Sequence, residues 1–390
     1  MGLSNSAMST KKATHQLTKQ HNRDLVLRTI FSRASISRAE VARVTHLTRT
    51  TVSDVVNGLL SEGLVEEVGR GESIGGKTPI LFSIVADSRY LIGLNLAQDK
   101  FTGAIVNLRG EIKELVEIPI HDDNGEKALL LVYQILDQLT RKKIKPIVGV
   151  GVGTPGLVNT REGVVINAVN LEWQDLPLSE LLKRKYKLPV LVVNDSQAAA
   201  IGEFVYGSDH SRDENLIVVN VIHGIGAGIL INGRLFQGDG GGAGEIGHVV
   251  VQENGDLCRC GQRGCLETVS SARAVVRHMK MGSLDEVFST YQTGNSKAKT
   301  VIEKAGFYLG VSLSNLIGTL NIRKIVLTGD MTRFGVEWLS AVSSAMQTGA
   351  FSRMTEETIL EIGKLDRACI LGASAFLLLD NYSLLFNEGK

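Results

Sequence analysis

The chain has 390 residues, and its 42 Lys and Arg against 41 Asp and Glu leave a formal net charge of only +1. That length leaves room for two or three domains with cores of their own. No apolar run approaches the roughly 20 residues that span a membrane, and the chain opens without a signal-peptide pattern. We therefore expect no membrane contact and a cytoplasmic location.

Basic charge is concentrated at the N-terminal end. Residues 1–57 carry nine Lys or Arg against Asp24, Glu40 and Asp54, a local excess of six positive charges that the rest of the chain offsets. Such asymmetry is typical of a nucleic-acid-binding segment in front of a more neutral domain. Residues 1–13 are expected to be disordered or an expression remnant outside the fold.

Three short helices are predicted next, in a domain of residues 14–88. The first covers residues 22–32; Ser37 and Glu40 form a capping box for the second, and Thr48 caps the third after a turn at residues 45–47. This order is that of a helix-turn-helix. The side chains expected in its core are Leu25, Val26, Thr29 and Ile30, then Val41, Ala42 and Val44, then Val52, Val55, Val56, Leu59 and Leu60.

Two predicted strands, at residues 64–68 and 79–84, flank a Gly-rich basic tip and complete a winged helix-turn-helix. Near the start of the third helix, short polar side chains and one arginine are left facing outward, and these residue types suit base edges and phosphates in the major groove of an operator DNA. A small helical domain that docks another protein is the alternative. The residues expected to contact DNA are Ser37, Arg38, Thr48, Arg49, Thr50, Thr51, Ser53, Asn57 and Lys77.

From Tyr90 onward, strands, glycines and helices alternate, which predicts an α/β domain with crossover helices. The expected elements are a strand meander at residues 91–96, 104–108 and 112–118, a helix at 126–140, buried strands at 147–152, 191–194 and 216–222, and a closing helix near 373–379.

Three of the four cysteines lie with a histidine in the most distinctive segment of the chain. His248, Cys258, Cys260 and Cys265 have the spacing H-x9-C-x-C-x4-C. Three thiolates and an imidazole are a ligand set that tetrahedral Zn²⁺ selects, and four protein ligands leave no open position for a catalytic water. We expect one structural zinc ion per chain. The alternative, a disulfide plus a free thiol, is disfavoured in a reducing compartment.

Two carboxylates, Glu245 and Glu267, flank the cysteine and histidine cluster. A loop folded around a metal would hold both acids in place, an arrangement suited to binding hydroxyl groups. The segment resembles the ROK family of sugar kinases and sugar-responsive repressors, whose signatures Glu-x-Gly-His and Cys-x-Cys-Gly-x-x-Gly-Cys-x-Glu are complete here. Residues 75–79 resemble the family's Gly-Gly-basic-x-Pro wing, and the resemblance covers the chain from about residue 14.

This resemblance implies a two-lobed, actin-like ATPase fold over residues 89–390, with a ligand cleft between the lobes. One lobe would take residues 89–200 plus the C-terminal helix, and the other residues 201–372. Asp195 stands where the kinases have their general base, and Asn170 taken alone is also explained as a turn residue. The resemblance implies sugar-binding roles for Gly156, Asn170, Asn194, Asp195, Gly224, Glu245, His248 and Glu267.

The phosphate side departs from the kinase pattern. Residues 95–100 (NLAQDK) align with Asp-x-Gly-Gly-Thr-Lys, so the acid and both glycines are missing. His223 replaces a threonine of the second phosphate loop, and Asp330 adds an acid where the kinases tend to have glycine. An acid facing a triphosphate is repulsive. We therefore expect no kinase activity and no catalytic residue, with Asp195 kept for sugar binding.

Together these features predict a sugar-responsive transcription factor, most simply a repressor of carbohydrate utilisation genes, such as those for xylose. It would bind a palindromic operator as a dimer or tetramer and leave the DNA when sugar closes the cleft. Activation by sugar is allowed as well. The alternatives are an ATP-dependent sugar kinase with an accessory DNA-binding domain, and a regulator that senses a phosphosugar or a partner protein.

Overall fold

The computed structural model describes residues 15–72, 78–121, 123–207, 215–348, 352–380 and 385–386. The chain divides into two compact units, residues 1–89 with 381–390, and residues 90–380. Leu385 is fully buried, and its carbonyl accepts a hydrogen bond from Arg89 Nε of the first unit at 3.2 Å. The predicted second domain, residues 89–390, is therefore longer than the second unit, which ends at residue 380. Within the described ranges, no helix is both long and apolar enough to cross a membrane.

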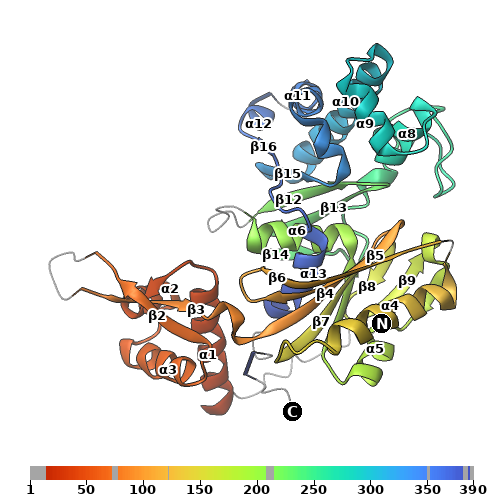
Figure 1. Ribbon diagram of the computed structural model, residues 1–390. Helices are drawn as coiled ribbons and strands as arrows, with labels where there is room; N and C mark the ends of the chain where they lie inside the picture. Colours follow the sequence, from red (N-terminus) through yellow and green to blue (C-terminus); the bar gives the residue numbers. More distant parts are fainter. Residues whose placement is uncertain are drawn as a thin grey trace, which may run out of the picture. The chain divides into compact units, whose positions relative to one another are not determined.

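The first unit is built from three helices and a small antiparallel sheet (Figure 1). Its elements are α1 His15–Phe31, β1 Ile36–Ser37, α2 Arg38–Thr45, α3 Arg49–Ser61, β2 Val65–Arg70, β3 Ile80–Ile84 and the 3-10 turn η1 Ala86–Ser88. The strands have the order β1-β3-β2, and the β2–β3 hairpin forms the wing. Because α2 and α3 follow each other across one tight turn, the unit is a winged helix-turn-helix.

Local signals in the sequence account for the helix boundaries of the first unit. Ser37 Oγ accepts the Glu40 N–H, and Thr48 Oγ1 accepts the Thr51 N–H, so both predicted caps are present. His46 ends α2 in the left-handed conformation, with φ of 56°. One prediction is wrong: Val44, expected in the core, is 41% exposed, because α2 is short and buries only Val41.

The first lobe of the second unit contains a five-stranded sheet. Its elements are β4 Tyr90–Leu96, β5 Lys100–Asn107, β6 Ile112–Pro119, α4 Gly125–Thr140, β7 Ile147–Thr154, β8 Leu157–Asn159, β9 Val164–Ala168, η2 Val169–Leu171, β10 Trp173–Leu176, α5 Leu178–Tyr186 and β11 Val190–Asn194. The order is β11-β7-β4-β5-β6, in which β4, β5 and β6 form the predicted antiparallel meander and β7 and β11 run parallel to β4. All eight residues of β7 are buried, which explains its continuous apolar and glycine run.

The second lobe repeats a five-stranded sheet with helices packed on it. Its elements are β12 Leu216–Val221, β13 Ile225–Ile231, β14 Arg234–Phe236, η3 Ile246–His248, α7 Glu267–Ser270, α8 Ala272–Met279, α9 Leu284–Gln292, α10 Ser296–Leu320, β15 Lys324–Thr328, η4 Asp330–Phe334, α11 Gly335–Gln347, α12 Ser352–Glu356 and β16 Ile359–Ile362. The order is β14-β13-β12-β15-β16, with β12, β15 and β16 parallel. Fully buried Trp338 of α11 lies in the core that the sheet shares with α8 to α11.

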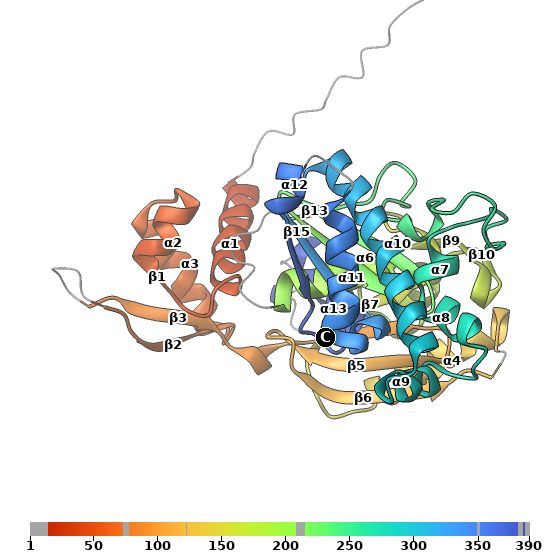
Figure 2. The same ribbon diagram turned by 90° about the horizontal axis from the view of Figure 1, so that it is seen from above.

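Two helices, α6 Asp195–Tyr206 and α13 Ala368–Asp380, lie side by side between the two sheets (Figures 1 and 2). A Cβ atom on Gly372 would lie 1.7 Å from the Ala198 carbonyl oxygen, so only glycine allows this close approach. α13 also packs on β4 and β7, which returns the end of the second unit to its first lobe. Since α13 begins at Ala368, the second lobe ends a few residues before the predicted residue 372.

Candidate functional site

A cavity of about 200 Å³ opens between the lobes of the second unit. Loops at the ends of β7, β9 and β11 line it from the first lobe, and the β12–β13 turn, η3 and α7 line it from the second. The fold brings together in this lining all eight residues that the sequence analysis associated with sugar binding, namely Gly156, Asn170, Asn194, Asp195, Gly224, Glu245, His248 and Glu267.

Asn194 and Asp195 stand where β11 turns into α6. Asn194 Oδ1 accepts the N–H groups of Ser196 and Gln197 at 2.9 and 3.2 Å, and its Nδ2 donates to the Gly156 carbonyl at 3.0 Å. The side chain of Asn194 is therefore a helix cap that holds Asp195 in place and ties it to the Gly156 loop.

The Asp195 carboxylate accepts hydrogen bonds from Ser196 N at 2.7 Å and Ser196 Oγ at 3.2 Å. Burial nevertheless raises the pKa of Asp195 to about 6, more than these hydrogen bonds lower it. Asp195 thus combines a cleft position with a perturbed proton affinity, a combination found at binding and catalytic sites.

Glu267 extends from α7 toward the middle of the cavity and is 8% exposed. One of its oxygens would lie 2.5 Å from a Cβ on Gly224, so the carboxylate occupies space that only glycine leaves open. Its other oxygen, Oε1, faces two guanidinium groups, Arg259 Nη2 at 3.3 Å and Arg273 Nη2 at 4.0 Å.

The predicted metal ligands converge beside the cavity. Ligand atoms of His248, Cys258, Cys260 and Cys265 all lie within 4.8 Å of one another, and all four cysteines of the chain are free. Metal–sulfur bonds of about 2.3 Å at tetrahedral angles put two sulfur atoms about 3.8 Å apart. The Cys260–Cys265 sulfur distance is 3.6 Å, as is that from Cys258 Sγ to His248 Nδ1. The cluster therefore fits a tetrahedral ion.

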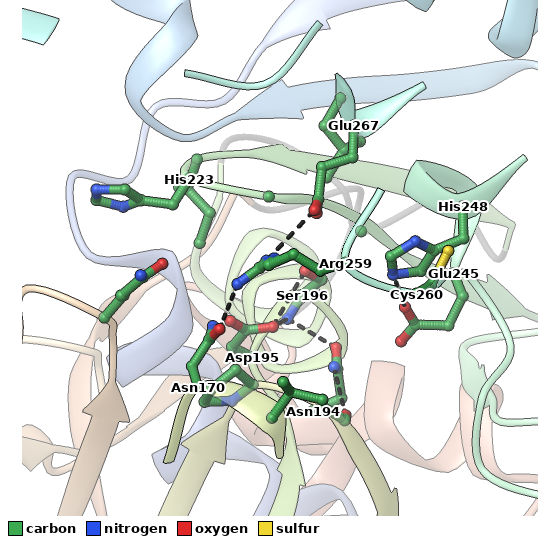
Figure 3. Close-up of a pocket in the computed structure, with 18 of the residues that line it drawn as sticks. Asn170, Asn194, Asp195, Ser196, His223, Glu245, His248, Arg259, Cys260 and Glu267 are labelled. Atoms are coloured by element: carbon green, nitrogen blue, oxygen red, sulfur yellow. Dashed lines mark hydrogen bonds and ion pairs between the residues drawn. The ribbon is translucent and has the colours of Figure 1, made fainter. Parts of the chain in front are cut away.

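His248 links this cluster to the cavity. Its Nδ1 faces the sulfurs, while Nε2 lies 3.9 Å from Glu245 Oε2 (Figure 3). Burial, then the nearby charges of Asp195 and Glu267, raise the pKa of Glu245 to about 7. A metal on Nδ1 would leave the other ring nitrogen for a carboxylate or a ligand.

Two arginines of the cavity were missed by the sequence analysis. Arg259 bonds Asn170 Oδ1 and Glu267, and Figure 3 shows its side chain between these two residues. Arg273, on α8, also donates to the His223 carbonyl at 3.3 Å. The only available signal was the position of Arg259 between two metal ligands. Asn170, for which a turn role was the alternative, lies in η2 with its side chain engaged by Arg259.

The other side of the cavity carries residues that the sequence analysis contrasted with the kinase pattern. Ala97 and Gln98, in the β4–β5 turn, and His223 line it, with His223 across the view from His248 in Figure 3. Burial raises the pKa of Asp330 in η4, opposed by the charge of His223 and reinforced by that of Asp99. Asp330 thus lies close enough to both His223 and Asp99 to interact with them electrostatically.

The first unit presents a separate candidate surface at the start of α3. Thr48, Arg49, Thr50 and Asn57 are exposed, and Thr51 and Ser53 are partly exposed. Ser37 is 8% exposed, and its hydroxyl oxygen caps α2 by accepting the Glu40 N–H at 3.2 Å. Arg38 donates to Asn57 Oδ1 at 2.9 Å and stacks on the Phe82 ring, which pairs two predicted contact residues with each other. Lys77 lies outside the described residues.

Comparisons with known proteins agree with this architecture. The ROK family model matches residues 91–379. The xylose repressor of Caldicellulosiruptor bescii is 32% identical over 393 residues, which cover 95% of this chain and 98% of the repressor. The glucokinase of Halalkalibacterium halodurans is 32% identical over 303 residues, covering 71% of this chain and 91% of the glucokinase. The crystal structure of a ROK family transcriptional regulator, a homolog of the Escherichia coli MLC protein, has a TM-score of 0.80 at 24% identity and covers 94% of this chain and 98% of its own.

Proposed function

This chain belongs to the ROK family, and we propose that it is a sugar-responsive, DNA-binding transcriptional repressor of carbohydrate utilisation genes. The main support for this proposal is that one chain combines a winged helix-turn-helix with a polar cleft lined by all eight candidate sugar-binding residues. The similarity to a xylose repressor along 95% of the chain supports this proposal. A cytoplasmic location follows from the function.

For DNA, we propose that α3 enters the major groove and that Thr48, Arg49, Thr50, Thr51 and Ser53 contact the operator, with Lys77 of the wing on the phosphates. Exposure of Arg49 and its neighbours at the start of α3 supports this. Arg38 and Asn57 would act through their mutual hydrogen bond, by holding α2 against α3. A dimer or tetramer would place two such helices on successive major grooves.

For the effector, we propose a neutral sugar. Asp195 and Glu245 line the cavity, whereas both of its arginines face the same carboxylate, that of Glu267. An anionic sugar phosphate would meet uncompensated acids, while a polyol can donate hydroxyl protons to them. Release from the operator requires the sugar to bind the off-DNA conformation more tightly, by about 5.5 kcal/mol for a near-complete switch.

We propose that the ion of the metal cluster is zinc, one per chain. The separations of 3.6 Å between pairs of ligand atoms, Cys258 Sγ to His248 Nδ1 and Cys260 Sγ to Cys265 Sγ, support a tetrahedral set of three sulfurs and one nitrogen. The chain's own residues then carry out the recognition, because the ordered loop holds Glu245 and Glu267 toward the cavity. A filled coordination shell supplies no catalytic water, so the role of the ion is structural.

Calorimetric titration tests the effector proposal. D-xylose, D-glucose and N-acetylglucosamine, each with its phosphate ester, are the probes, and random-duplex selection supplies the operator. We expect one neutral sugar to bind and to release the protein from the selected duplex. Tight binding of a sugar phosphate instead would favour the phosphosugar alternative, and no binding of any probe together with no selected duplex would refute the proposal.

A sugar kinase is the second candidate function, favoured by the cleft and by the 32% identity to a glucokinase. Phosphoryl transfer depends on positioning and charge neutralisation around the phosphates. The acids Asp99 and Asp330, near His223 on the kinase-type phosphate side, argue against ATP binding. With sugar and Mg-ATP we expect no phosphoryl transfer above background. Sugar-dependent ATP turnover that Asp195→Asn abolishes would restore the kinase interpretation.

A further inference from the structure

One guanidinium group joins the two lobes across the cavity. Arg259 belongs to the cysteine loop of the second lobe, and its Nη1 bonds Asn170 Oδ1 of η2 in the first lobe. Its Nη2 lies 3.3 Å from Glu267 Oε1 in α7 of the second lobe. Figure 3 shows the side chain lying between these partners, at the centre of the lining.

Both partners of Arg259 are groups that the proposed function assigns to sugar hydroxyls. An amide oxygen and a carboxylate oxygen accept hydrogen bonds, and a planar guanidinium offers them donors in a fixed fork, much as two neighbouring hydroxyls of a sugar would. While Arg259 occupies them, a sugar cannot use both acceptors at once.

The Arg259 guanidinium can move out of the site without leaving the buried Glu267 carboxylate unpaired. The Arg259 side chain is 38% exposed, and Arg259 is not itself one of the four predicted metal ligands, although its neighbours Cys258 and Cys260 are. Glu267 has a 10% exposed side chain, and Arg273 would remain 4.0 Å from its Oε1 after Arg259 moved away. The carboxylate would therefore keep a cationic partner, which lowers the cost of displacement.

We propose that the Arg259 side chain occupies the sugar subsite in the ligand-free protein. There it bridges Asn170 and Glu267, and it is displaced when a neutral sugar binds. This inference rests on the proposed function for its ligand, while the bridge itself is independent of any sugar. It makes Arg259 a determinant of sugar affinity. It also makes two correctly spaced hydroxyls the requirement for replacing the bridge.

Hydrogen exchange without sugar tests the bridge. We expect amides of residues 164–176 to exchange several-fold faster in Arg259→Met than in the wild type, because η2 loses its link to the second lobe. Arg263→Met is the matched control, since Arg263 is in the same loop and donates to the Gly255 carbonyl, away from Asn170. Asn170→Ala breaks the same bridge from the other lobe. If Arg259→Met loses its metal, the exchange rates of Asn170→Ala test the bridge instead. Unchanged exchange in Asn170→Ala and in metal-retaining Arg259→Met would overturn the bridge.

Titration with D-xylose and D-glucose tests displacement. The dissociation constant of the sugar that binds should fall about three- to tenfold in Arg259→Met and stay unchanged in Arg263→Met, since the wild type must first give up two charge-assisted contacts. A weaker affinity in Arg259→Met would overturn displacement and make Arg259 a direct sugar contact. If neither sugar binds either protein, displacement fails together with the proposed effector, whereas faster exchange in Arg259→Met would still show that the bridge itself exists.

Discussion

The proposed DNA-binding surface of the first unit and the cleft of the second use polar side chains in opposite ways. Thr48, Arg49 and Thr50 are exposed and lie next to one another at one helix start. In the cleft, Asn194 and Glu267 are each 8% exposed, and their polar atoms already bond residues from other segments. A substitution on the surface should thus change one contact, whereas a substitution in the cleft should change several.

The largest effect is expected at the metal cluster. Cys260→Ser should reduce the metal content from about one ion per chain to none and abolish the sugar response, because the loop also carries Glu245, Arg259 and Glu267. Elemental analysis and calorimetry measure both effects. Cys369→Ser is the control, since Cys369 bonds Asn95 and lies outside the cluster. A metal-free Cys260→Ser protein with full sugar affinity would show that sugar binding does not depend on the metal-ordered loop.

Asp195→Asn should impair sugar binding strongly and leave operator binding intact. The loss of a charged acceptor costs about 1.5 to 3 kcal/mol, roughly ten- to hundredfold in affinity. Calorimetry and a gel-shift assay on the selected duplex separate the two functions, with exposed Asp175→Asn as the matched substitution. Equal loss of both functions would mean that the site at the start of α6 is a folding element rather than a binding site.

Arg49→Ala should weaken operator binding by about 1 to 3 kcal/mol and relax the sequence preference at one base pair. Lys77→Ala should instead weaken binding evenly across sequences if it contacts phosphate alone. Arg184→Ala, which removes an exposed cation of α5 in the other unit, is the charge control. Unaltered operator affinity in the Arg49 and Lys77 variants would put the DNA-binding surface elsewhere.

The smallest predicted effect is a pH dependence of sugar binding. Burial raises the pKa of Asp195 to about 6, so lowering the pH from 7.5 to 5 should weaken D-xylose binding about tenfold if the ionised form accepts the hydroxyl proton. The free energy of unfolding should respond in the opposite direction. The folded state holds this proton more tightly, so the stabilisation present below about pH 4 is lost as the pH rises through about 6. Asp195→Asn should flatten both profiles.

Much of the first unit and of the metal cluster was predictable because the relevant signals are local. The caps at Ser37 and Thr48 bond backbone groups three residues away, and both are present. The four predicted metal ligands lie within eighteen residues, so their spacing alone indicates a cluster. The same locality misled at Val44, because an eight-residue helix is too short for its pattern to predict which side chains are buried.

By itself, the sequence determined which elements form and which residue types can bind a metal or a polyol, since periodicity, capping and ligand spacing act over a few residues. Only the tertiary structure decided which of those groups are already engaged. Arg259 and Asn170 lie 89 residues apart and meet only because two lobes face each other across α6 and α13. The raised pKa of Asp195 has the same origin, because burial depends on segments packed around a residue rather than on its neighbours in the chain.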